Sequence, residues 1–320
     1  MGQNKTMPPE QIKKYNMELD LNDYFIVEEK PVFNLSIKLV IPSGCNAKCP
    51  FCFNLLNKNT AVYDKKAFLD NFIDSLNHII DTAGPQRSIS LDITGNEPTH
   101  DIDLFMATMQ KINSIKHRFN KIVLTTNGEN LSKLDVLKHV GDVVDFVNLS
   151  VHHYRESERC KAFGIQPIDS IFYGQIIDAL HSYNIKVTAV AVLYKELNTT
   201  FVTFVRNFAI WAKKFRFDNI RIRSNFYKTD DFFTRYMNDT TFGNEIIRAE
   251  GLNTKYLDVD GMEVILLQGV TTLIGHVVGV EAVVDDDGKP YLDYGKCYPF
   301  KGKYIEHVYV LKNKSIFNTK

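Results

Sequence analysis

Short apolar runs rich in β-branched residues alternate with longer amphipathic runs along most of this chain, beginning at residue 36. The long runs repeat apolar residues at helical spacing, as Phe68, Phe72 and Leu76 do. Strands that alternate with helices pair in parallel through right-handed crossovers. Six such units in succession predict a barrel or a partial barrel, whose chemistry lies in the loops after the strands. The predicted strands are 36–41, 88–94, 121–126, 143–151, 186–193 and 220–226, and the predicted helices are 64–80, 101–115, 131–139, 167–183 and 201–215.

The pattern divides the chain into three parts. Residues 1–35 form a polar N-terminal segment, and residues 36–228 hold the alternating units. Beyond them, Asp260-Gly261 and Asp287-Gly288 are hairpin-type turn pairs between β-rich runs. We therefore expect residues 229–320 to be a β-rich C-terminal extension that covers the mouth of the barrel.

The composition of the 320 residues is that of an ordinary globular protein, with 44 % apolar residues. Basic and acidic residues both number 38, and this balance gives no signal for a protein built to bind nucleic acid. No apolar run is long enough to span a bilayer, and the polar start lacks the apolar core of a signal peptide. The sequence therefore predicts a cytoplasmic protein with no membrane partner.

Three of the five cysteines lie within eight residues, directly after the first predicted strand. Cys45, Cys49 and Cys52 have the spacing Cys-x3-Cys-x2-Cys, which in a reducing compartment indicates metal binding rather than disulfides. A structural zinc site normally has four protein ligands, and a 4Fe-4S cluster normally has four thiolates. Three thiolates leave one position open for chemistry. The alternative is a non-catalytic zinc or iron-sulfur protein that takes a fourth ligand from elsewhere, such as His152.

Two more motifs follow the second and third predicted strands. Gly95-Asn96-Glu97-Pro98 comes after one, and Thr125-Thr126-Asn127-Gly128 closes the other. Either motif alone is typical of an ordinary turn. Their shared position at strand ends, together with the cysteines, favours one common site.

In this order the three motifs resemble those of the radical S-adenosylmethionine (SAM) superfamily, over about residues 36–226. The resemblance implies a (β/α)6 partial TIM barrel with a 4Fe-4S cluster on Cys45, Cys49 and Cys52, and with SAM chelating the fourth iron. It implies reductive cleavage of SAM to methionine and a 5′-deoxyadenosyl radical, which abstracts hydrogen from the substrate. It also implies an electron donor such as flavodoxin or ferredoxin.

The resemblance further implies residues that bind SAM. Phe51 has the place of an aromatic residue whose backbone faces the adenine, and the Glu97 carboxylate is offered to the SAM ammonium. The family's loop is usually Gly-Gly-Glu-Pro, and here Asn96 replaces the second glycine; asparagine tolerates positive φ, so the turn can persist. The cofactor-binding candidates are Phe51, Gly95, Asn96, Glu97, Thr126, Asn127, Ser150, His152, Arg221 and Arg223.

The later candidates come from strand alternation. Ser150 and His152 are predicted to share a face at the end of the fourth strand. The resemblance implies that this strand end contacts the SAM carboxylate or ribose. Arg221 and Arg223 share a face of the last strand and are placed to hold an anionic substrate or the SAM carboxylate. The charged run 155–159 is predicted to be a solvated loop.

The substrate is left open as a nucleotide, a small metabolite or a short peptide. Only Cys297 follows residue 226, so no auxiliary cluster is expected. No catalytic residue is identified, although Cys160, Tyr154 and Cys297 are candidates for a hydrogen donor that quenches the substrate radical.

Overall fold

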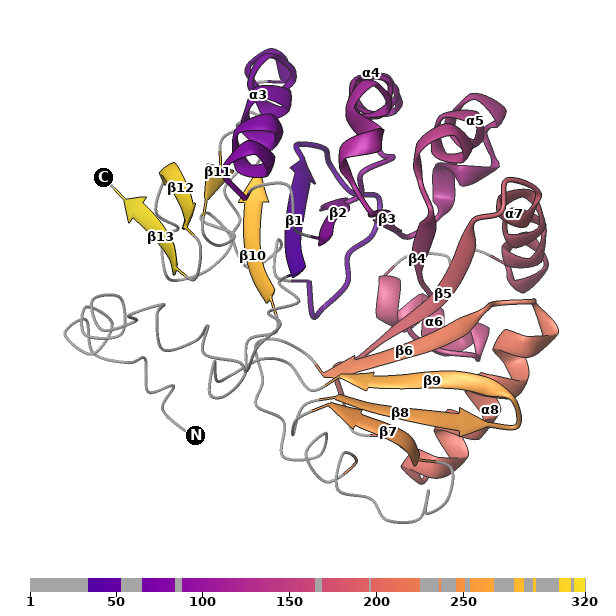
Figure 1. Cartoon of the computed structure of the whole chain (residues 1–320). Helices are drawn as coiled ribbons and strands as arrows, with labels where there is room; N and C mark the ends of the chain where they lie inside the picture. Colours follow the sequence, from indigo (N-terminus) through magenta and orange to yellow (C-terminus); the bar gives the residue numbers. More distant parts are fainter. Residues whose placement is uncertain are drawn as a thin grey trace, which may run out of the picture.

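The computed structural model describes residues 34–52, 65–83, 88–164, 169–195, 197–224, 236, 246–250, 254–267, 279–284, 290–291, 305–311 and 314–319. Six parallel strands pair in chain order and curve into an arc, as Figure 1 shows. The predicted order of strands is confirmed. The strands are β1 (Asn34–Ile41), β2 (Ser88–Gly95), β3 (Lys121–Thr126), β4 (Phe146–Ser150), β5 (Lys186–Leu193) and β6 (Asn219–Ser224).

Helices follow the first five strands, and most of them lie on the outer face of the arc (Figure 1). Local capping explains where two of them begin: Asp101 accepts a hydrogen bond from Leu104 N, and Thr200 accepts one from Thr203 N. Pro167 and Asp64, expected at two helix starts, lie outside the described residues. The helices are α3 (Lys65–Ala83), α4 (Ile102–Ile115), α5 (Leu134–Val143), α6 (Glu156–Phe163), α7 (Ser170–Ser182) and α8 (Phe201–Lys214), with short 3-10 turns η2 (Lys116–Arg118) and η3 (Glu129–Ser132).

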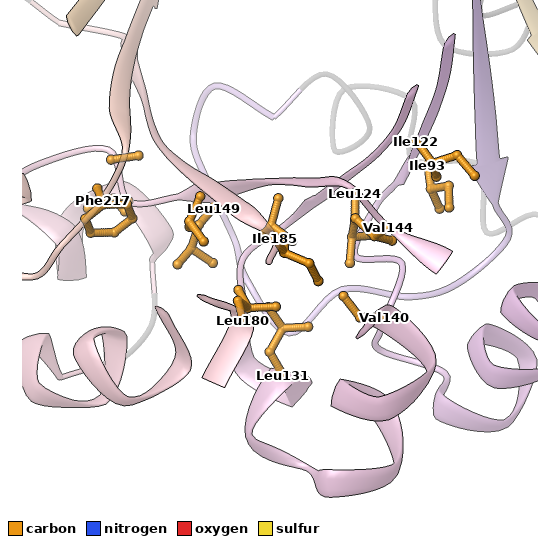
Figure 2. Packing of buried hydrophobic residues seen from close by; sticks show 14 of the residues in the cluster. Ile93, Ile122, Leu124, Leu131, Val140, Val144, Leu149, Leu180, Ile185 and Phe217 are labelled. Atoms are coloured by element: carbon orange, nitrogen blue, oxygen red, sulfur yellow. The ribbon is translucent and has the colours of Figure 1, made fainter. Parts of the chain in front are cut away.

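The hydrophobic core lies between the strands and the outer helices (Figure 2). On β3 and β6, apolar residues that face the helices alternate with partly exposed residues that face the inside of the arc. Burying one such Leu, Ile or Val contributes about 1.5–3 kcal/mol relative to leaving it exposed. Representative core residues are Ile93, Ile122, Leu124, Val140, Leu149, Leu180, Ile185 and Phe217.

The C-terminal strands extend the same sheet at both of its edges. β9 (Met262–Leu267) pairs in parallel with β6, and β10 (Gly279–Val284) pairs in parallel with β1. Within the described residues the sheet reaches eleven strands, in the order β11-β10-β1-β2-β3-β4-β5-β6-β9-β8-β7. The remaining strands of this sheet are β7 (Ile246–Glu250), β8 (Thr254–Val259) and β11 (Pro290–Tyr291). β12 (Ile305–Leu311) and β13 (Lys314–Thr319) pair with each other in a separate two-stranded antiparallel sheet.

These strands agree with the predicted β-rich character of the extension. Asp260 and Gly261 both have positive φ, 52° and 76°, as a tight turn between β8 and β9 requires. The other predicted turn, Asp287-Gly288, lies outside the described residues. The expected role of the extension as a cover stays a prediction.

One stretch differs from the sequence-based expectation. The charged run 155–159 is not a solvated loop, because Glu156–Phe163 forms helix α6 and Arg159 is fully buried in it. Of the other charged residues of α6, Glu156 and Lys161 are exposed and Glu158 is half-buried. The uniformly polar sequence of this run therefore gave no sign that Arg159 is buried.

Within the described residues, no helix has both the length and the apolar character needed to cross a membrane.

Candidate active site at the carboxyl ends of the strands

Hydrogen bonds around Glu97 join the loops that follow β1, β2 and β3. Its carboxylate is buried, with Oε1 accepting from Thr99 N (3.1 Å), Thr99 Oγ1 (2.7 Å) and Thr126 Oγ1 (2.5 Å). Oε2 accepts from Asn127 N at 2.6 Å. Burial raises the pKa of Glu97 above its ordinary value, and these four hydrogen bonds oppose the rise. The carboxylate therefore holds the end of β3 against the loop after β2.

The backbone of Glu97 reaches the loop after β1 in the same way. Glu97 N donates to the carbonyl of Gly44 at 3.2 Å, and Ser43 Oγ donates to the carbonyl of Glu97. One residue thus connects three strand ends. Thr99, whose hydroxyl and N–H both reach Glu97, was not predicted from the sequence, since a threonine two residues beyond a motif carries no signal of its own.

Gly95 and Asn96 fit this loop for different reasons. Gly95 has a φ of 142°, and a Cβ atom there would lie 2.7 Å from the carbonyl oxygen of Ile41, so no other residue fits without a backbone shift. Asn96 does not adopt positive φ. Its side chain instead donates from Nδ2 to the carbonyl of Ser43 at 2.8 Å. The tolerance of asparagine for positive φ, expected to preserve the turn, is therefore not what the loop uses.

The cysteine loop runs from the end of β1 along this edge. Cys45 is exposed, and Cys49 and Cys52 are half-buried. Ala47 N donates to Cys45 Sγ at 3.4 Å, and Cys52 N donates to the carbonyl of Cys49 at 3.0 Å. In the described part of the chain, no group of three His, Cys, Asp or Glu side chains is arranged to hold a single metal ion. A 4Fe-4S cluster does not require such convergence, because each thiolate binds a different iron atom.

Two contacts fix this loop to its surroundings. Asn127 Nδ2 donates to Asn46 Oδ1 at 2.7 Å, which ties the loop to the end of β3. On the other side, Lys48 N donates to the carbonyl of Phe163, the last residue of α6, at 2.7 Å. Asn46 and Phe163 were not among the predicted site residues, because both contacts join segments far apart in the sequence.

The three thiols have the chemistry that an iron-sulfur cluster needs. Burial, together with Cys52 and Cys45, raises the pKa of Cys49 to about 12, so the metal-free loop holds this thiol protonated. The cysteines influence one another electrostatically, as they do only at short range. Soft thiolates close together suit iron, whose binding displaces the thiol protons. This donor set therefore fits a cluster.

Phe51 and His152 form an aromatic group beside the cysteines. The Phe51 ring lies 4.8 Å from the His152 ring and 4.9 Å from that of Tyr194, and His152 also lies 4.8 Å from Phe163. Tyr194, just after β5, was not predicted as a site residue. The group links the cysteine loop to the ends of β4 and β5.

His152 does not follow the strand alternation used to predict it. β4 ends at Ser150, and His152 has a φ of 66°. Val192 N donates to His152 Nδ1 at 3.3 Å, which puts the proton of the neutral ring on Nε2. Burial, with nearby Arg223, lowers the pKa of His152 to about 3, so the ring is neutral at physiological pH.

Of the remaining SAM-binding candidates, Arg221 and Arg223 lie on the face of β6 opposite the buried Ile220 and Ile222. That is the inner face of the arc. Ser150 is half-buried, and its carbonyl lies 3.5 Å from the Tyr173 hydroxyl.

The candidates for quenching a substrate radical are placed differently. Cys160 is half-buried on α6, whereas Tyr154 accepts a hydrogen bond from Asn207 Nδ2 at 3.3 Å and stacks on His153. Cys297 lies outside the described residues.

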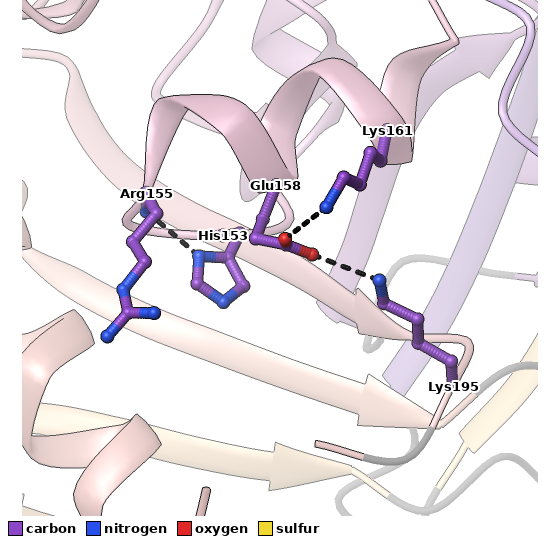
Figure 3. A network of polar contacts seen from close by, with 5 residues as sticks. All are labelled: His153, Arg155, Glu158, Lys161 and Lys195. Carbon is purple, nitrogen blue, oxygen red and sulfur yellow. Dashed lines mark hydrogen bonds and ion pairs between the residues drawn. The ribbon is translucent and has the colours of Figure 1, made fainter. Parts of the chain in front are cut away.

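Polar contacts join helix α6 to the segments that follow β4 and β5 (Figure 3). Glu158 bonds Lys161 Nζ at 2.7 Å and Lys195 Nζ, beyond β5, at 3.0 Å. These bonds lower the pKa of Glu158 to about 2. His153 Nδ1 accepts from Arg155 N at 2.8 Å at the start of the helix.

Arg159 anchors the same segment from inside. Its Nη1 donates to the carbonyls of His153 (3.3 Å) and Tyr154 (3.0 Å), and its Nη2 donates to Ser170 Oγ at 2.7 Å. The guanidinium also lies 5.6 Å from the Tyr173 ring and 5.3 Å from that of Trp211. The residues that follow β4 are therefore held to α7 and α8.

Replacing Arg159 with Met is expected to lower the free energy of unfolding by about 2–4 kcal/mol, because it leaves the carbonyls of His153 and Tyr154 and the Ser170 hydroxyl without their donor. Urea unfolding followed by circular dichroism measures the change. Arg159→Lys keeps one donor and should lose less. Equal stability of Arg159→Met and the unchanged protein would contradict this role.

Comparison with known proteins gives the family of the chain. The model of the radical SAM superfamily matches residues 39–206, more than half of the sequence. The chain belongs to the radical SAM superfamily. None of the curated proteins compared with it matches.

Solved structures support the fold. SuiB from Streptococcus suis, bound to its precursor peptide SuiA, superposes with a TM-score of 0.57 at 14 % identity, covering 92 % of this chain and 67 % of SuiB. Native anSMEcpe with bound AdoMet has a TM-score of 0.54 at 16 % identity, covering 83 % of this chain and 75 % of that one. In the SAM-bound SuiB structure the match spans only 51 % of the SuiB chain.

Family membership decides several expectations. The chain is a radical SAM enzyme with the expected partial-barrel fold, and its cofactors are a 4Fe-4S cluster and SAM. As a radical SAM enzyme it requires a reductant and a substrate. A non-catalytic zinc or iron-sulfur protein is therefore set aside.

Proposed function

We propose that Cys45, Cys49 and Cys52 bind the 4Fe-4S cluster and that SAM binds beside them, against the ends of β1 to β4. The observation that carries this proposal is the hydrogen-bond network of Glu97, which joins the cysteine loop to the two other motifs. When the reduced cluster is bound, it supplies the electron that splits SAM into methionine and a 5′-deoxyadenosyl radical, which takes a hydrogen atom from the substrate.

The chain's own residues bind and orient. Phe51 and His152 form the apolar wall against which the adenosine packs, and the neutral Nε2–H of His152 is free of the Val192 contact and can donate to SAM. Gly95, Asn96, Thr126 and Asn127 present backbone and amide groups to the SAM amino acid. Glu97 remains a candidate for the SAM ammonium, and its internal bonds make it above all the residue that positions these loops. Ser150, Arg221 and Arg223 line the inner face of the sheet below the proposed SAM site.

The substrate belongs to one of three classes: a nucleotide, a small metabolite or a short peptide. The SuiB structure, bound to a precursor peptide, favours the last. We further propose flavodoxin or ferredoxin as the electron donor and the cytoplasm as the compartment, since free thiols need reducing conditions. Residues 229–320 would form an extension that covers the site and keeps water out. Among possible radical quenchers, Cys160 remains a candidate, as do Tyr154 and Cys297.

The test is SAM cleavage by anaerobically reconstituted protein. With dithionite as the reductant, 5′-deoxyadenosine should accumulate, and it should not accumulate when dithionite is omitted. Liquid chromatography measures the product. Protein that holds its full iron content but forms no 5′-deoxyadenosine under these conditions would contradict the proposed function.

A further inference from the structure

Several polar side chains on the inner face of β1 to β4 are bonded to one another. Lys38 Nζ pairs with Asp92 Oδ2, and Thr125 Oγ1 donates to Asp92 Oδ1 at 3.1 Å. Asn148 Nδ2 in turn donates to Thr125 Oγ1 at 3.3 Å. Both oxygens of the Asp92 carboxylate are therefore engaged by other residues of the chain.

The cations of this face differ in what they contact. Lys38 is paired with Asp92, and Lys121 Nζ lies 3.9 Å from the centre of the Phe146 ring. Arg221 has no such arrangement: its Nε is buried without a hydrogen-bond partner in the described part of the chain. A buried donor without an acceptor is costly, and such groups in native proteins are normally satisfied by a ligand, water or ion.

The two register partners of Arg221 supply no acceptor for its Nε. Its register partners are Val190 on β5 and Ile265 on β9, and both are buried and apolar. Burial lowers the pKa of Arg221, and Asp92 and Tyr256 only partly oppose this effect. Arg221 in turn helps to lower the pKa of Lys121, an effect that Asp92 and Asp145 oppose.

A second unsatisfied atom lies on the same strand. Asn219, two residues before Arg221, has its Oδ1 buried without a partner among the described residues. By alternation the two side chains share the inner face of β6. This strand thus presents a charged donor and an amide acceptor side by side.

Arg221 lies one inward-facing position before Arg223 on β6, and Arg223 lies near the proposed SAM site. Arg223, the next inward-facing residue toward the carboxyl end of β6, is close enough to His152 to lower its pKa. His152 touches Phe51, which lies between two of the cysteines. A ligand held at Arg221 would therefore extend up the inner face toward the cysteine loop.

We propose that Arg221 binds a carboxylate of the substrate, with Asn219 accepting a hydrogen bond from an adjacent N–H or O–H group. This inference rests on the proposed function and names its substrate class: a carboxylic acid, either a free small acid or an acidic residue of a peptide. A guanidinium presents two parallel donors that match a planar carboxylate. One guanidinium suits a single negative charge better than a doubly charged phosphate ester.

The experiment measures ligand binding to the reconstituted holoenzyme by isothermal titration calorimetry. The small probes are butyrate, butyramide and methyl phosphate, and the peptide probes are acetyl-Ala-Glu-Ala-amide and acetyl-Ala-Gln-Ala-amide. We expect at least one carboxylate probe to bind roughly tenfold or more tightly than its amide, as charge-assisted hydrogen bonds provide. Preference for butyrate would identify a small acid, and preference for the Glu peptide would identify a peptide.

Substitutions test whether Arg221 causes the preference for carboxylate over amide probes. Arg221→Gln should abolish it, Arg221→Lys should retain part of it, and Arg216→Gln, at an exposed arginine paired with Asp178, should leave it intact. Equal binding of both carboxylates and their amides, or tighter binding of methyl phosphate, would overturn the proposal. So would an Arg221→Gln protein that loses SAM affinity but keeps the carboxylate preference, since Arg221 would then serve SAM.

The proposed function and the carboxylate site at Arg221 are tested by separate experiments. SAM cleavage by the unchanged holoenzyme tests the proposed function and needs no substrate. The comparison of carboxylate with amide uses only the unchanged protein, so it stands even if an Arg221 variant does not fold.

Discussion

Replacing Cys45, Cys49 and Cys52 together with alanine should reduce the iron content of anaerobically reconstituted protein from about four atoms per chain to near zero. Cleavage of SAM should disappear with it, because without thiolates nothing in the loop retains iron. The loop is partly exposed, so the fold should survive the change. Iron analysis, the visible absorption of the cluster and 5′-deoxyadenosine formation measure the outcome.

The matched control is Cys160→Ala, which removes a half-buried cysteine on α6 rather than one of the cysteine loop. Its iron content should equal that of the unchanged protein. If the triple variant kept its iron, or if Cys160→Ala lost it, the assignment of ligands would be wrong.

The second large effect is expected from Glu97→Ala. The substitution leaves the N–H groups of Thr99 and Asn127 and two hydroxyls without their acceptor inside the protein. We expect the free energy of unfolding to fall by about 3 kcal/mol, since each unsatisfied buried donor costs about 1–3 kcal/mol. SAM affinity should also fall by roughly tenfold or more, because the loops that carry the proposed site lose their common tie.

Urea unfolding and SAM titration of the reconstituted protein measure these two effects. Glu97→Gln should be nearly as damaging, because its amide nitrogen turns a donor toward groups that are already donors. Glu156→Gln, on the outer side of α6, serves as the control and should change neither quantity. A stable Glu97→Ala protein with normal SAM affinity would show that the network does not position the site.

Much of the fold was predictable from local patterns. The strands 121–126 and 186–193 were predicted with the bounds that the structure has, because β-branched runs between clear helix signals leave little ambiguity. The predicted bounds differ from those of the structure where the local sequence signal is weak. The helix predicted from residue 131 begins at Leu134, since Gly128 with positive φ first leads into the 3-10 turn η3.

The site was predictable as a set of motifs but not as a network. Spacing alone put the three cysteines, Gly95–Pro98 and Thr125–Gly128 at successive strand ends. It gave no reason to include Thr99, Asn46, Tyr194 or Arg159. Each of these acts through a contact with a residue distant in the sequence or through a motif neighbour, and such contacts leave no local pattern.

The sequence by itself determined the order of strands and helices, the cysteine spacing and the places of the motifs, because these depend on periodicity and on residues close along the chain. Only the tertiary structure decided that Glu97 turns inward to join three loops, that α6 buries Arg159, and that C-terminal strands extend both edges of the sheet. It also decided that Arg221 Nε has no acceptor among the described residues. Each of these outcomes depends on which distant groups meet in the fold, and burial sets their energy.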